Sequence, residues 1–401
     1  MPSVDRPLRT RDSALRIGLF TYATQARGGV AHAVELANAL HDLGHDVVLH
    51  ALDESGRGFF RQPRAPYRRI VVEPHSGGIV TYVRSRVASY LDAWDPRTPP
   101  FDVYHAHDGI SGNALATLVE RGAIPSFTRT VHHADDYTDP TLDELQERSI
   151  RSAEACFVVS DVWRTRVRER FGIEAKRVGN GVDLARFVPA KAAERARTRK
   201  GFGFGGGPLF LVIGGIEARK NTIGSLEAFA EVRRTLPSAQ LVIAGGASVF
   251  DHSAYRKAFA ARAETLGLEL GSPVVFLGVV PDAEMPNLIA AADALVFPSL
   301  MEGFGLVILE ALASGVPVVT SAIAPFTEYL DARSAILVDP HDHRAIATGM
   351  REALDPRVRA RRIEAGADVA ARHTWAGVAR AHITYYEETI VARNALRCAL
   401  A

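Results

Sequence analysis

The sequence predicts an α/β protein built from two doubly wound domains of similar construction. Three observations lead to this prediction. The chain has 401 residues, which is long for one hydrophobic core and fits two domains of roughly 200 residues. Short apolar runs alternate with helix-length segments, as in parallel sheets covered by helices. The alternation stops near residue 189 in a charged, glycine-rich stretch and restarts at residue 208.

The first half begins with a strand, a glycine turn and a helix. Leu15–Ala23 is a buried strand candidate, and Gly28-Gly29 precedes a helix whose apolar face repeats until Gly44 ends it. Bare amides at such a turn, with the positive end of the helix, can hold an anion. A tight turn without a ligand is the alternative. Further strands are expected at 45–52, 101–107, 126–133 and 155–160.

The second half repeats this order. Strands are expected at 209–215, 239–246, 273–278, 292–299 and 315–321, with helix-length segments between them. We therefore expect a disordered tail at 1–14, a first domain at 15–188, a linker at 189–207, a second domain at 208–375 and a long helix at 376–401.

Composition excludes several classes of protein. With 47 basic and 46 acidic residues, the net charge of +1 gives no reason to expect a nucleic-acid partner. Cys156 and Cys398 are too few for a disulfide framework or a cysteine zinc site. The opening segment lacks an apolar signal core, and no apolar run approaches 18 residues. We expect a soluble cytoplasmic protein, for which peripheral membrane contact has no supporting signal.

Three weaker motifs have simple explanations. A G-x-G-x-x-G match lacks the preceding strand and following helix of a dinucleotide loop. An aspartate-rich stretch has the letters of the magnesium motif of all-helical prenyl synthases, but it follows a strand, so a loop or helix cap is favoured. An arginine run is favoured as a solvated helix face over a phosphate- or membrane-facing patch. The three motifs are Gly201/Gly203/Gly206, Asp135/Asp136/Asp139 and Arg164/Arg166/Arg168/Arg170.

Four histidines stand at the ends of two expected strands: His105, His107, His132 and His133. The carboxyl ends of parallel strands line the ligand crevice of such folds, so a hydrogen-bonding role in a substrate cleft is favoured. A metal site and packed structural histidines are the alternatives.

Two glutamates, Glu302 and Glu310, stand eight positions apart around a glycine-aromatic-glycine turn. Eight residues of one straight helix rise about 12 Å, whereas paired carboxyls of a glycosidase face each other across roughly 5 to 9.5 Å. These glutamates are therefore expected to contact one ligand in sequence. The amides of Gly303, Phe304 and Gly305 can approach a diphosphate closely.

Taken together, the motifs resemble the retaining glycosyltransferases of family 4, which have the GT-B fold. The matching segments run in the family's order over nearly the whole chain, and they are GGV, ELANALHDLGHDV, DVYHAHD, TVHH, VGNGVDLARF, GGIEARKN and PSLMEGFGLVILEALASGVPVV. The resemblance implies two Rossmann-like domains facing across a cleft. Residues 15–188 would bind the acceptor, 208–375 the nucleotide sugar, and the last helix would cross back to the first domain.

The resemblance also implies roles for individual residues. Glu302 would reach the hydroxyls of the donor sugar, Glu310 the ribose, and Lys220 the diphosphate. Gly29 would lie against the same diphosphate, and His132 near the reacting sugar carbon. His132, Lys220 and Glu302 are thus the expected catalytic residues, with His105, His107 and Asn180 as acceptor-side candidates.

One position departs from the family pattern. Gly214-Gly215 stands where the family usually has glycine-arginine, and that arginine normally helps to neutralise the diphosphate. Arg219, beside Lys220, is the expected substitute. A double glycine followed by Arg-Lys-Asn occurs in a less-studied bacterial branch, so we interpret it as a subgroup mark.

The expected reaction moves a sugar from a nucleotide diphosphate sugar to an acceptor hydroxyl with retention. A UDP-sugar is the expected donor, with GDP- and ADP-sugars as alternatives. We expect no metal or other cofactor, because Lys220 and backbone amides take the metal's role. The alternatives are a GT-B-fold sugar-nucleotide epimerase, which would lack the EGFGLVILE segment, and a catalytically silent binding protein. The sequence names no sugar, acceptor or oligomeric state.

Overall fold

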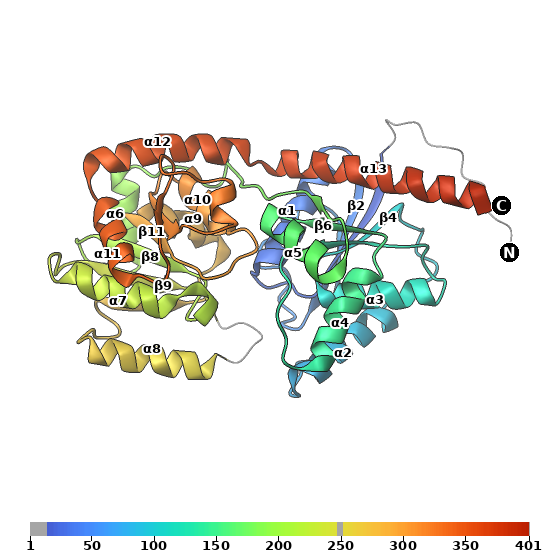
Figure 1. The fold of residues 1–401 in the computed structure, drawn as a ribbon, viewed down its shortest axis with the longest axis horizontal. Coiled ribbons are helices and arrows are strands. Elements are labelled where there is room, and N and C mark those ends of the chain that lie inside the picture. The colour runs from blue at the N-terminus through green and yellow to red at the C-terminus, as the bar shows by residue number, and fades with distance from the viewer. Residues whose placement is uncertain (1–13, 247–251, 401) are drawn as a thin grey trace. The chain divides into compact units, whose positions relative to one another are not determined.

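The computed structural model describes residues 14–246 and 252–400, which form two compact units (Figure 1). The first unit takes in the chain up to Val158, Val167–Val178 and the residues from Ala376 on. The second takes in Val159–Arg166 and Gly179–Trp375. The expected tail lies outside the described residues, except for Ala14.

The first unit contains a parallel sheet in the order β3-β2-β1-β4-β5-β6-β7. Buried apolar runs form its central strands, as the sequence predicts, so side chains such as Ile17, Leu19 and Val131 have no exposed surface. The strand order reverses between β1 and β4, and ligands of such sheets bind outside the carboxyl ends of the strands at this point. The strands are β1 (Arg16–Thr21), β2 (Asp46–Asp53), β3 (Tyr67–Val71), β4 (Val103–Ala106), β5 (Thr128–Val131), β6 (Ala155–Val158) and β7 (Lys176–Arg177).

Helices cover this sheet. The first one buries Val30, Val34 and Leu40, as its apolar period predicts. The Asp139 carboxylate accepts hydrogen bonds from the Thr141 and Leu142 amides and so caps α4, which is the helix-cap interpretation of the aspartate-rich stretch. The helices are α1 (Gly28–Asp42), α2 (Ile79–Asp92), α3 (Gly109–Glu120), α4 (Pro140–Arg151), α5 (Asp161–Phe171) and α13 (Trp375–Leu400). Both α5 and α13 begin in residues of the second unit.

The second unit contains a parallel sheet in the order β10-β9-β8-β11-β12-β13, so its order reverses between β8 and β11. Its strands are β8 (Leu209–Ile213), β9 (Gln240–Ala244), β10 (Val274–Gly278), β11 (Ala294–Phe297), β12 (Val318–Ser321) and β13 (Ile336–Val338). Its helices are α6 (Ala192–Gly201), α7 (Thr222–Arg233), α8 (Ser253–Thr265), α9 (Met285–Ala291), α10 (Leu306–Ala313), α11 (His343–Glu352) and α12 (Pro356–Arg372), with short 3-10 helices at Ala218–Lys220, Asp282–Glu284 and Phe326–Glu328.

The segment interpreted as a linker, 189–207, contains helix α6 instead. The Arg195 and Arg199 guanidiniums lie 2.8 and 2.7 Å from the two carboxylate oxygens of Asp293. These ion pairs hold α6 against the segment that follows α9. Two of the charged residues of segment 189–207 are therefore paired and do not simply face solvent. The G-x-G-x-x-G match begins at Gly201, the last residue of this helix, and precedes β8, as the sequence order indicated.

None of the helices in the described ranges combines the length and the apolar character that crossing a membrane requires.

Candidate active site

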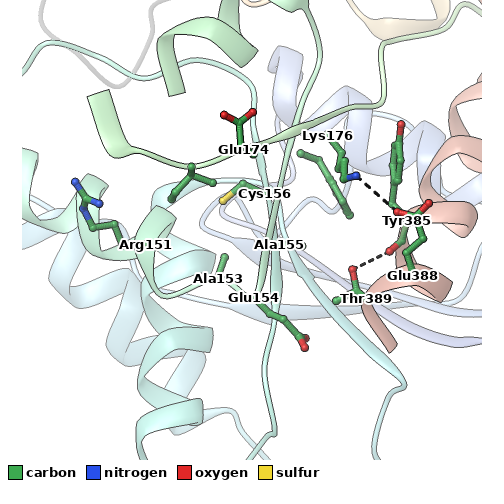
Figure 2. A pocket seen from close by; sticks show the side chains of 12 residues that line it. Arg151, Ala153, Glu154, Ala155, Cys156, Glu174, Lys176, Tyr385, Glu388 and Thr389 are labelled. Carbon is green, nitrogen blue, oxygen red and sulfur yellow. Dashed lines mark hydrogen bonds and ion pairs between the residues drawn. The ribbon is translucent and has the colours of Figure 1, made fainter. Parts of the chain in front are cut away.

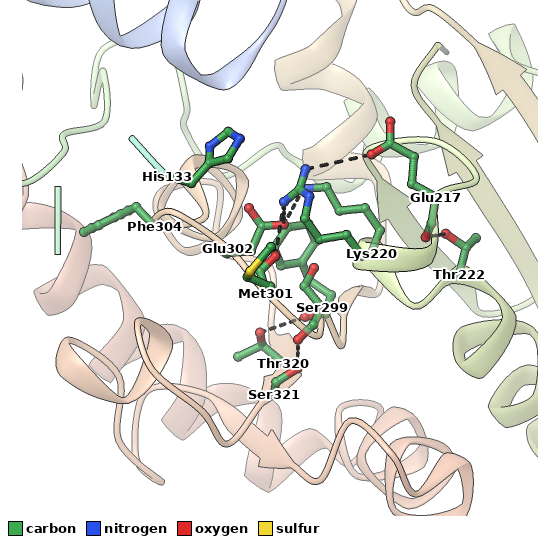
Figure 3. Close-up of polar contacts among 12 residues, drawn as sticks. His133, Glu217, Lys220, Thr222, Ser299, Met301, Glu302, Phe304, Thr320 and Ser321 are labelled. Atoms are coloured by element: carbon green, nitrogen blue, oxygen red, sulfur yellow. Dashed lines mark hydrogen bonds and ion pairs between the residues drawn. The ribbon is translucent and has the colours of Figure 1, made fainter. Parts of the chain in front are cut away.

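In the second unit, the loops that follow β8 and β11 bring three expected residues together. The Lys220 ammonium donates a hydrogen bond of 2.6 Å to Oε1 of Glu302 (Figure 3). Nη1 of Arg219 lies 2.8 Å from the same oxygen and donates to the Met301 carbonyl at 3.1 Å. These loops flank the point where the strand order reverses, which is where doubly wound sheets bind ligands.

The cluster is a network of buried and half-buried charges, in which Arg219 also lies 3.8 Å from the Glu217 carboxylate. The side chains of Glu302 and Lys220 are 9% and 13% exposed. Burial alone would raise the pKa of Glu302, but the charges of Lys220 and Arg219 bring it below its ordinary value. Burial, reinforced by Arg219, lowers the pKa of Lys220 against the opposing effect of Glu302. An ammonium has three donors and a guanidinium five, so both cations keep hydrogen-bonding capacity for a phosphate.

The turn after Glu302 leads directly into α10. Gly305, the residue before the helix, has a φ of +96°, which a glycine adopts without strain. No side chain caps the helix and no acidic residue stands in its first turn. Its uncapped amide end therefore has the character of an anion site.

The single-helix geometry used to compare the two glutamates is wrong. Helix α10 begins at Leu306, so Glu302 lies in the preceding turn and only Glu310 is helical. The glycine-rich turn interrupts the helical pattern, and the spacing of 12 Å along one axis does not apply. Glu302 thus precedes the amide end of α10, and Glu310 is the fifth residue of that helix.

Three side chains that the sequence analysis did not single out contact the carbonyls of this turn. Nε1 of Trp163 donates to the Glu302 carbonyl at 2.8 Å, and the Ser160 hydroxyl donates to the Gly303 carbonyl at 2.9 Å. The Tyr329 hydroxyl donates to the Phe304 carbonyl at 3.0 Å. Ser160 and Trp163 precede the turn by about 140 positions, and no local pattern announces so distant a contact.

In the first unit, Gly29 lies against His132. A β-carbon at Gly29 would lie 3.1 Å from Cδ2 of His132, which is closer than nine in ten real contacts of a β-carbon. A larger residue would therefore push the ring. Nε2 of His132 is buried without a hydrogen-bond partner among the described residues.

Five imidazole rings, those of His32, His105, His107, His132 and His382, form a buried histidine cluster in the first unit. Their neighbouring centroids lie between 4.3 and 5.8 Å apart. Burial first, and then neighbouring imidazoles, lower the pKa values of His105, His107 and His132 well below 6.5. Among the described residues, no group of three or more His, Cys, Asp or Glu side chains is arranged to hold a metal ion.

The structure corrects the expectation for His105. Its ring has no exposed surface, and its two nitrogens bond to the Tyr386 hydroxyl at 2.6 Å and the Thr130 hydroxyl at 2.8 Å. The ring is thus a packed structural histidine, the alternative left open for this motif. His107 is also buried, whereas Asn180 belongs to the second unit. The three acceptor-side candidates are therefore not brought together within one unit.

The backbone explains why residue 215 is a glycine. Gly215 has a φ of +77°, and a β-carbon there would lie 2.8 Å from the Gly246 carbonyl oxygen. The usual family arginine does not fit this backbone without a shift. Arg219 reaches Glu302 from the end of the same loop.

Three arginines of the run in α5 form ion pairs or a cation–π contact with neighbouring side chains. Arg164 pairs with Asp161 at 2.8 Å, and the Arg166 guanidinium lies 4.9 Å from the centre of the Trp163 ring. Arg170 pairs with Asp136 and Asp143.

A pocket of about 350 Å³ lies elsewhere in the first unit, lined by residues around β6, β7 and α13 (Figure 2). Lys176 and Glu388, which form part of its wall, are themselves paired at 3.8 Å. None of the expected site residues lines this pocket.

Comparisons with known proteins identify the family of this chain. Residues 27–181 match the family profile described as a glycosyl transferase 4-like domain, and residues 194–369 match glycosyl transferases group 1. A D-inositol 3-phosphate glycosyltransferase from Acidothermus cellulolyticus is 29% identical over 77% of this chain and 72% of its own length. A mannosylfructose-phosphate synthase from Agrobacterium fabrum is 30% identical over 89% of this chain and 86% of its own length.

Solved structures share the fold. The Anabaena protein Alr3699/HepE in complex with UDP-glucose superposes with a TM-score of 0.76 at 18% identity, covering 94% of this chain and 100% of the other. Sucrose-phosphate synthase from Thermosynechococcus elongatus gives the same TM-score and coverages at 20% identity. The chain therefore belongs to the glycosyl transferase group 1 family, the retaining family 4, and is a nucleotide-sugar glycosyltransferase with the GT-B fold.

Proposed function

We propose that this enzyme transfers a sugar from a UDP-sugar to an acceptor hydroxyl, with retention of configuration at the sugar carbon. The observation that carries the proposal is the convergence of Lys220, Arg219 and Glu302 beside the uncapped amide end of α10. Cations and amides suit a diphosphate, and a carboxylate suits sugar hydroxyls. The UDP-glucose bound to a protein of the same fold supports a uridine donor.

A GDP-sugar is the second candidate donor. A mannosyltransferase from Mycolicibacterium smegmatis, described as GDP-mannose-dependent, is 36% identical over 59% of this chain and 61% of its own length. The Glu302 cluster would serve either donor, because it faces the diphosphate and sugar common to both.

In the proposed mechanism, Lys220 and Arg219 turn from Glu302 to the diphosphate when the donor binds. Glu302 is then released to accept hydrogen bonds from the sugar, and Glu310 holds the ribose. The acceptor attacks from the face that the diphosphate leaves, and the departing phosphate oxygen takes the acceptor's proton. His132 is assigned to the neighbourhood of the reacting carbon. Catalysis rests on positioning and on stabilising the charge of the leaving diphosphate.

A donor panel tests the substrate assignment. UDP-glucose, GDP-mannose and ADP-glucose would be compared by thermal shift, because a ligand at 100 times its dissociation constant adds about 2.7 kcal/mol to stability. Product analysis with and without an acceptor then separates transfer from epimerisation, since an epimerase converts the donor alone. Binding without any turnover or hydrolysis would instead favour a silent protein.

Calorimetry on two variants tests the roles of the glutamates. Glu310→Ala should weaken binding of the bare nucleoside diphosphate, because its proposed partner is the ribose. Glu302→Ala should spare that binding, because both cations remain, and should reduce turnover. Glu264→Ala removes an exposed carboxylate of α8 and serves as the matched control. The opposite pattern would mean that the two roles are exchanged.

A further inference from the structure

We propose that Ser160, Trp163 and Tyr329 are positioning residues that aim three successive backbone amides at the donor. The inference rests on the proposed function for its ligand, a nucleoside diphosphate sugar. It starts from an arrangement within the second unit: three consecutive carbonyls, those of Glu302, Gly303 and Phe304, each accept a hydrogen bond from a different side chain.

Peptide planarity converts these contacts into an orientation of the amides. In a trans peptide, the carbonyl of one residue and the N–H of the next lie in one plane and point in opposite directions. Holding the carbonyls of residues 302, 303 and 304 toward the three donors therefore turns the N–H groups of Gly303, Phe304 and Gly305 the other way. In the described part of the chain, the amides of Gly303 and Phe304 donate to no other group. They are free to donate to a phosphate or sugar oxygen.

The direction of each hydrogen bond is fixed by chemistry. An indole N–H can only donate, and a hydroxyl facing a carbonyl must donate. Burial, and then the charges of Glu302 and Glu328, raise the pKa of Tyr329 well above 10, so its hydroxyl keeps its proton. Ser160 is fully buried and Trp163 is 2% exposed, so water cannot readily replace either donor.

A fourth residue closes the network. The Glu328 carboxylate accepts hydrogen bonds from the Asp161 and Val162 amides at 2.7 and 2.8 Å and so holds the first turn of α5. Its neighbour Tyr329 stacks on Phe304, with ring centres 4.6 Å apart. Side chains at the start of α5 thus bond to the turn, and the adjacent residues Glu328 and Tyr329 contact both: Glu328 bonds to α5, and Tyr329 bonds to the turn.

The test removes one donor at a time and keeps most of each side chain: Ser160→Ala, Trp163→Phe and Tyr329→Phe. Ser314→Ala is the matched control, because it removes a buried hydroxyl of the second unit that has no partner in the described structure. The probes are UMP, UDP and UDP-glucose, with GMP, GDP and GDP-mannose as the parallel series.

Each variant should weaken binding of the diphosphate and the diphosphate sugar by roughly tenfold, as expected for a lost buried hydrogen bond. Binding of the monophosphate should change much less, because it lacks the second phosphate and the sugar. A merely structural role would weaken all three ligands together. Equal losses for monophosphate and diphosphate, or no loss, would overturn the proposal.

Hydrogen exchange provides a second readout that needs no ligand. Peptides that cover the Ile308 amide, which donates to the Gly305 carbonyl, and the Asp161 and Val162 amides, which donate to Glu328, should exchange faster in the three variants than in the wild type and in Ser314→Ala. Unchanged exchange would contradict the positioning role. The wild-type protein could bind none of the six nucleotides while the exchange pattern appears as expected. In that case the proposed donor is wrong, but the three side chains still position the turn.

Discussion

At the scale of single residues, two adjacent cations converge on Glu302. Lys220 and Arg219 are adjacent in sequence, yet both reach the same carboxylate oxygen, at 2.6 and 2.8 Å. The short 3-10 helix Ala218–Lys220 and the left-handed backbone of Asn221, with φ of 54°, turn the two side chains together. Arg219 is therefore directed at the cluster although it is 33% exposed.

The first prediction concerns these cations. Lys220→Ala should lower turnover by two or more orders of magnitude, about 2.7 kcal/mol or more, because charge builds on the departing diphosphate. Arg219→Ala should cost a comparable factor, since the structure directs it at Glu302. Stability should fall little in either single variant, because Glu302 keeps one cation. Steady-state kinetics and melting curves measure both effects.

Lys257→Ala is the control for this experiment, because it removes an exposed lysine of α8 in the same unit. Near wild-type turnover in a folded Lys220→Ala protein would contradict the assignment of Lys220 to the diphosphate site.

The second prediction concerns residue 215. Gly215→Arg, which restores the usual family residue, should lower activity, because a β-carbon there meets the Gly246 oxygen at 2.8 Å on a backbone with positive φ. Gly206→Arg is the control, since a β-carbon there meets nothing within 4 Å. Kinetics and thermal melting of both variants give the comparison. A rise in activity for Gly215→Arg would show that the loop rearranges at little cost.

Sequence reasoning reached the residues of the site only where a local pattern marks them. Lys220, Glu302 and the glycine turn stand in distinctive segments, and the structure brings them together. Ser160, Trp163 and Tyr329 were missed because they act through ordinary hydrogen bonds to carbonyls far away in sequence. His105 was assigned to a cleft because the end of a parallel strand predicts that a residue lies near the ligand crevice. Whether its side chain is buried depends on the element that packs over it, which here is α13.

At the scale of elements, helix α13 completes the core of the first unit. Its Tyr386 hydroxyl bonds to His105, and its His382 ring lies 5.8 Å from His32 of α1 and 5.6 Å from His105 of β4. His382 also contacts Phe157 of β6. A segment that the sequence predicts only as a long helix thus contributes to a buried imidazole cluster.

The third prediction is a loss of stability on acidification. Burial, and then His32, lower the pKa of His382 to about 3, against 6.5 for an ordinary histidine, so the unfolded chain takes up the proton first. Stability is complete above pH 6.5 and falls as the pH drops from 6.5 toward 3. For His382 alone the loss amounts to roughly 2 kcal/mol between pH 6.5 and 5.

His382→Gln should reduce this pH dependence, because an amide side chain does not titrate. Chemical denaturation at pH 7 and pH 5 measures the difference. His41→Gln, an exposed position on α1, is the control. An equal pH dependence in the wild type and His382→Gln would show that the ring is protonated in the folded protein.

The elements that sequence reasoning missed are those that are not stabilised by a buried apolar run. The buried strands β1, β8 and β11 follow from their apolar runs, but β3 was missed because its residues Tyr67–Val71 are largely exposed and two of them are arginines. Helix α6 was taken for a linker because its stability comes from ion pairs with Asp293 and not from an apolar face.

At the scale of the whole molecule, both units have the same central strand order, with the fourth strand returning beside the first. This order places a glycine-rich turn after β1 and another after β8, each next to the loop from the neighbouring strand. The alternation of strands and helices was enough to predict this architecture, because parallel sheets leave few other ways to connect such elements.

The fourth prediction concerns metal dependence. If Lys220, Arg219 and the amide end of α10 neutralise the diphosphate, treatment with EDTA should leave turnover nearly unchanged. The measurement is the rate of donor consumption before and after chelation. A loss that magnesium or manganese restores would reassign the charge neutralisation to a bound cation.

Helix α5 has a consequence for how such proteins can recombine. Its first residues group with the second unit and its last ones with the first. In a hybrid protein whose gene is joined between positions 179 and 207, Ser160 and Trp163 would therefore come from one parent and the turn at Glu302–Gly305 that they contact from the other. Inheriting the turn together with its supports requires a junction before Val159, and the incoming segment then also carries Val167–Val178 of the first unit. The two halves of the gene consequently do not correspond to two independently exchangeable parts.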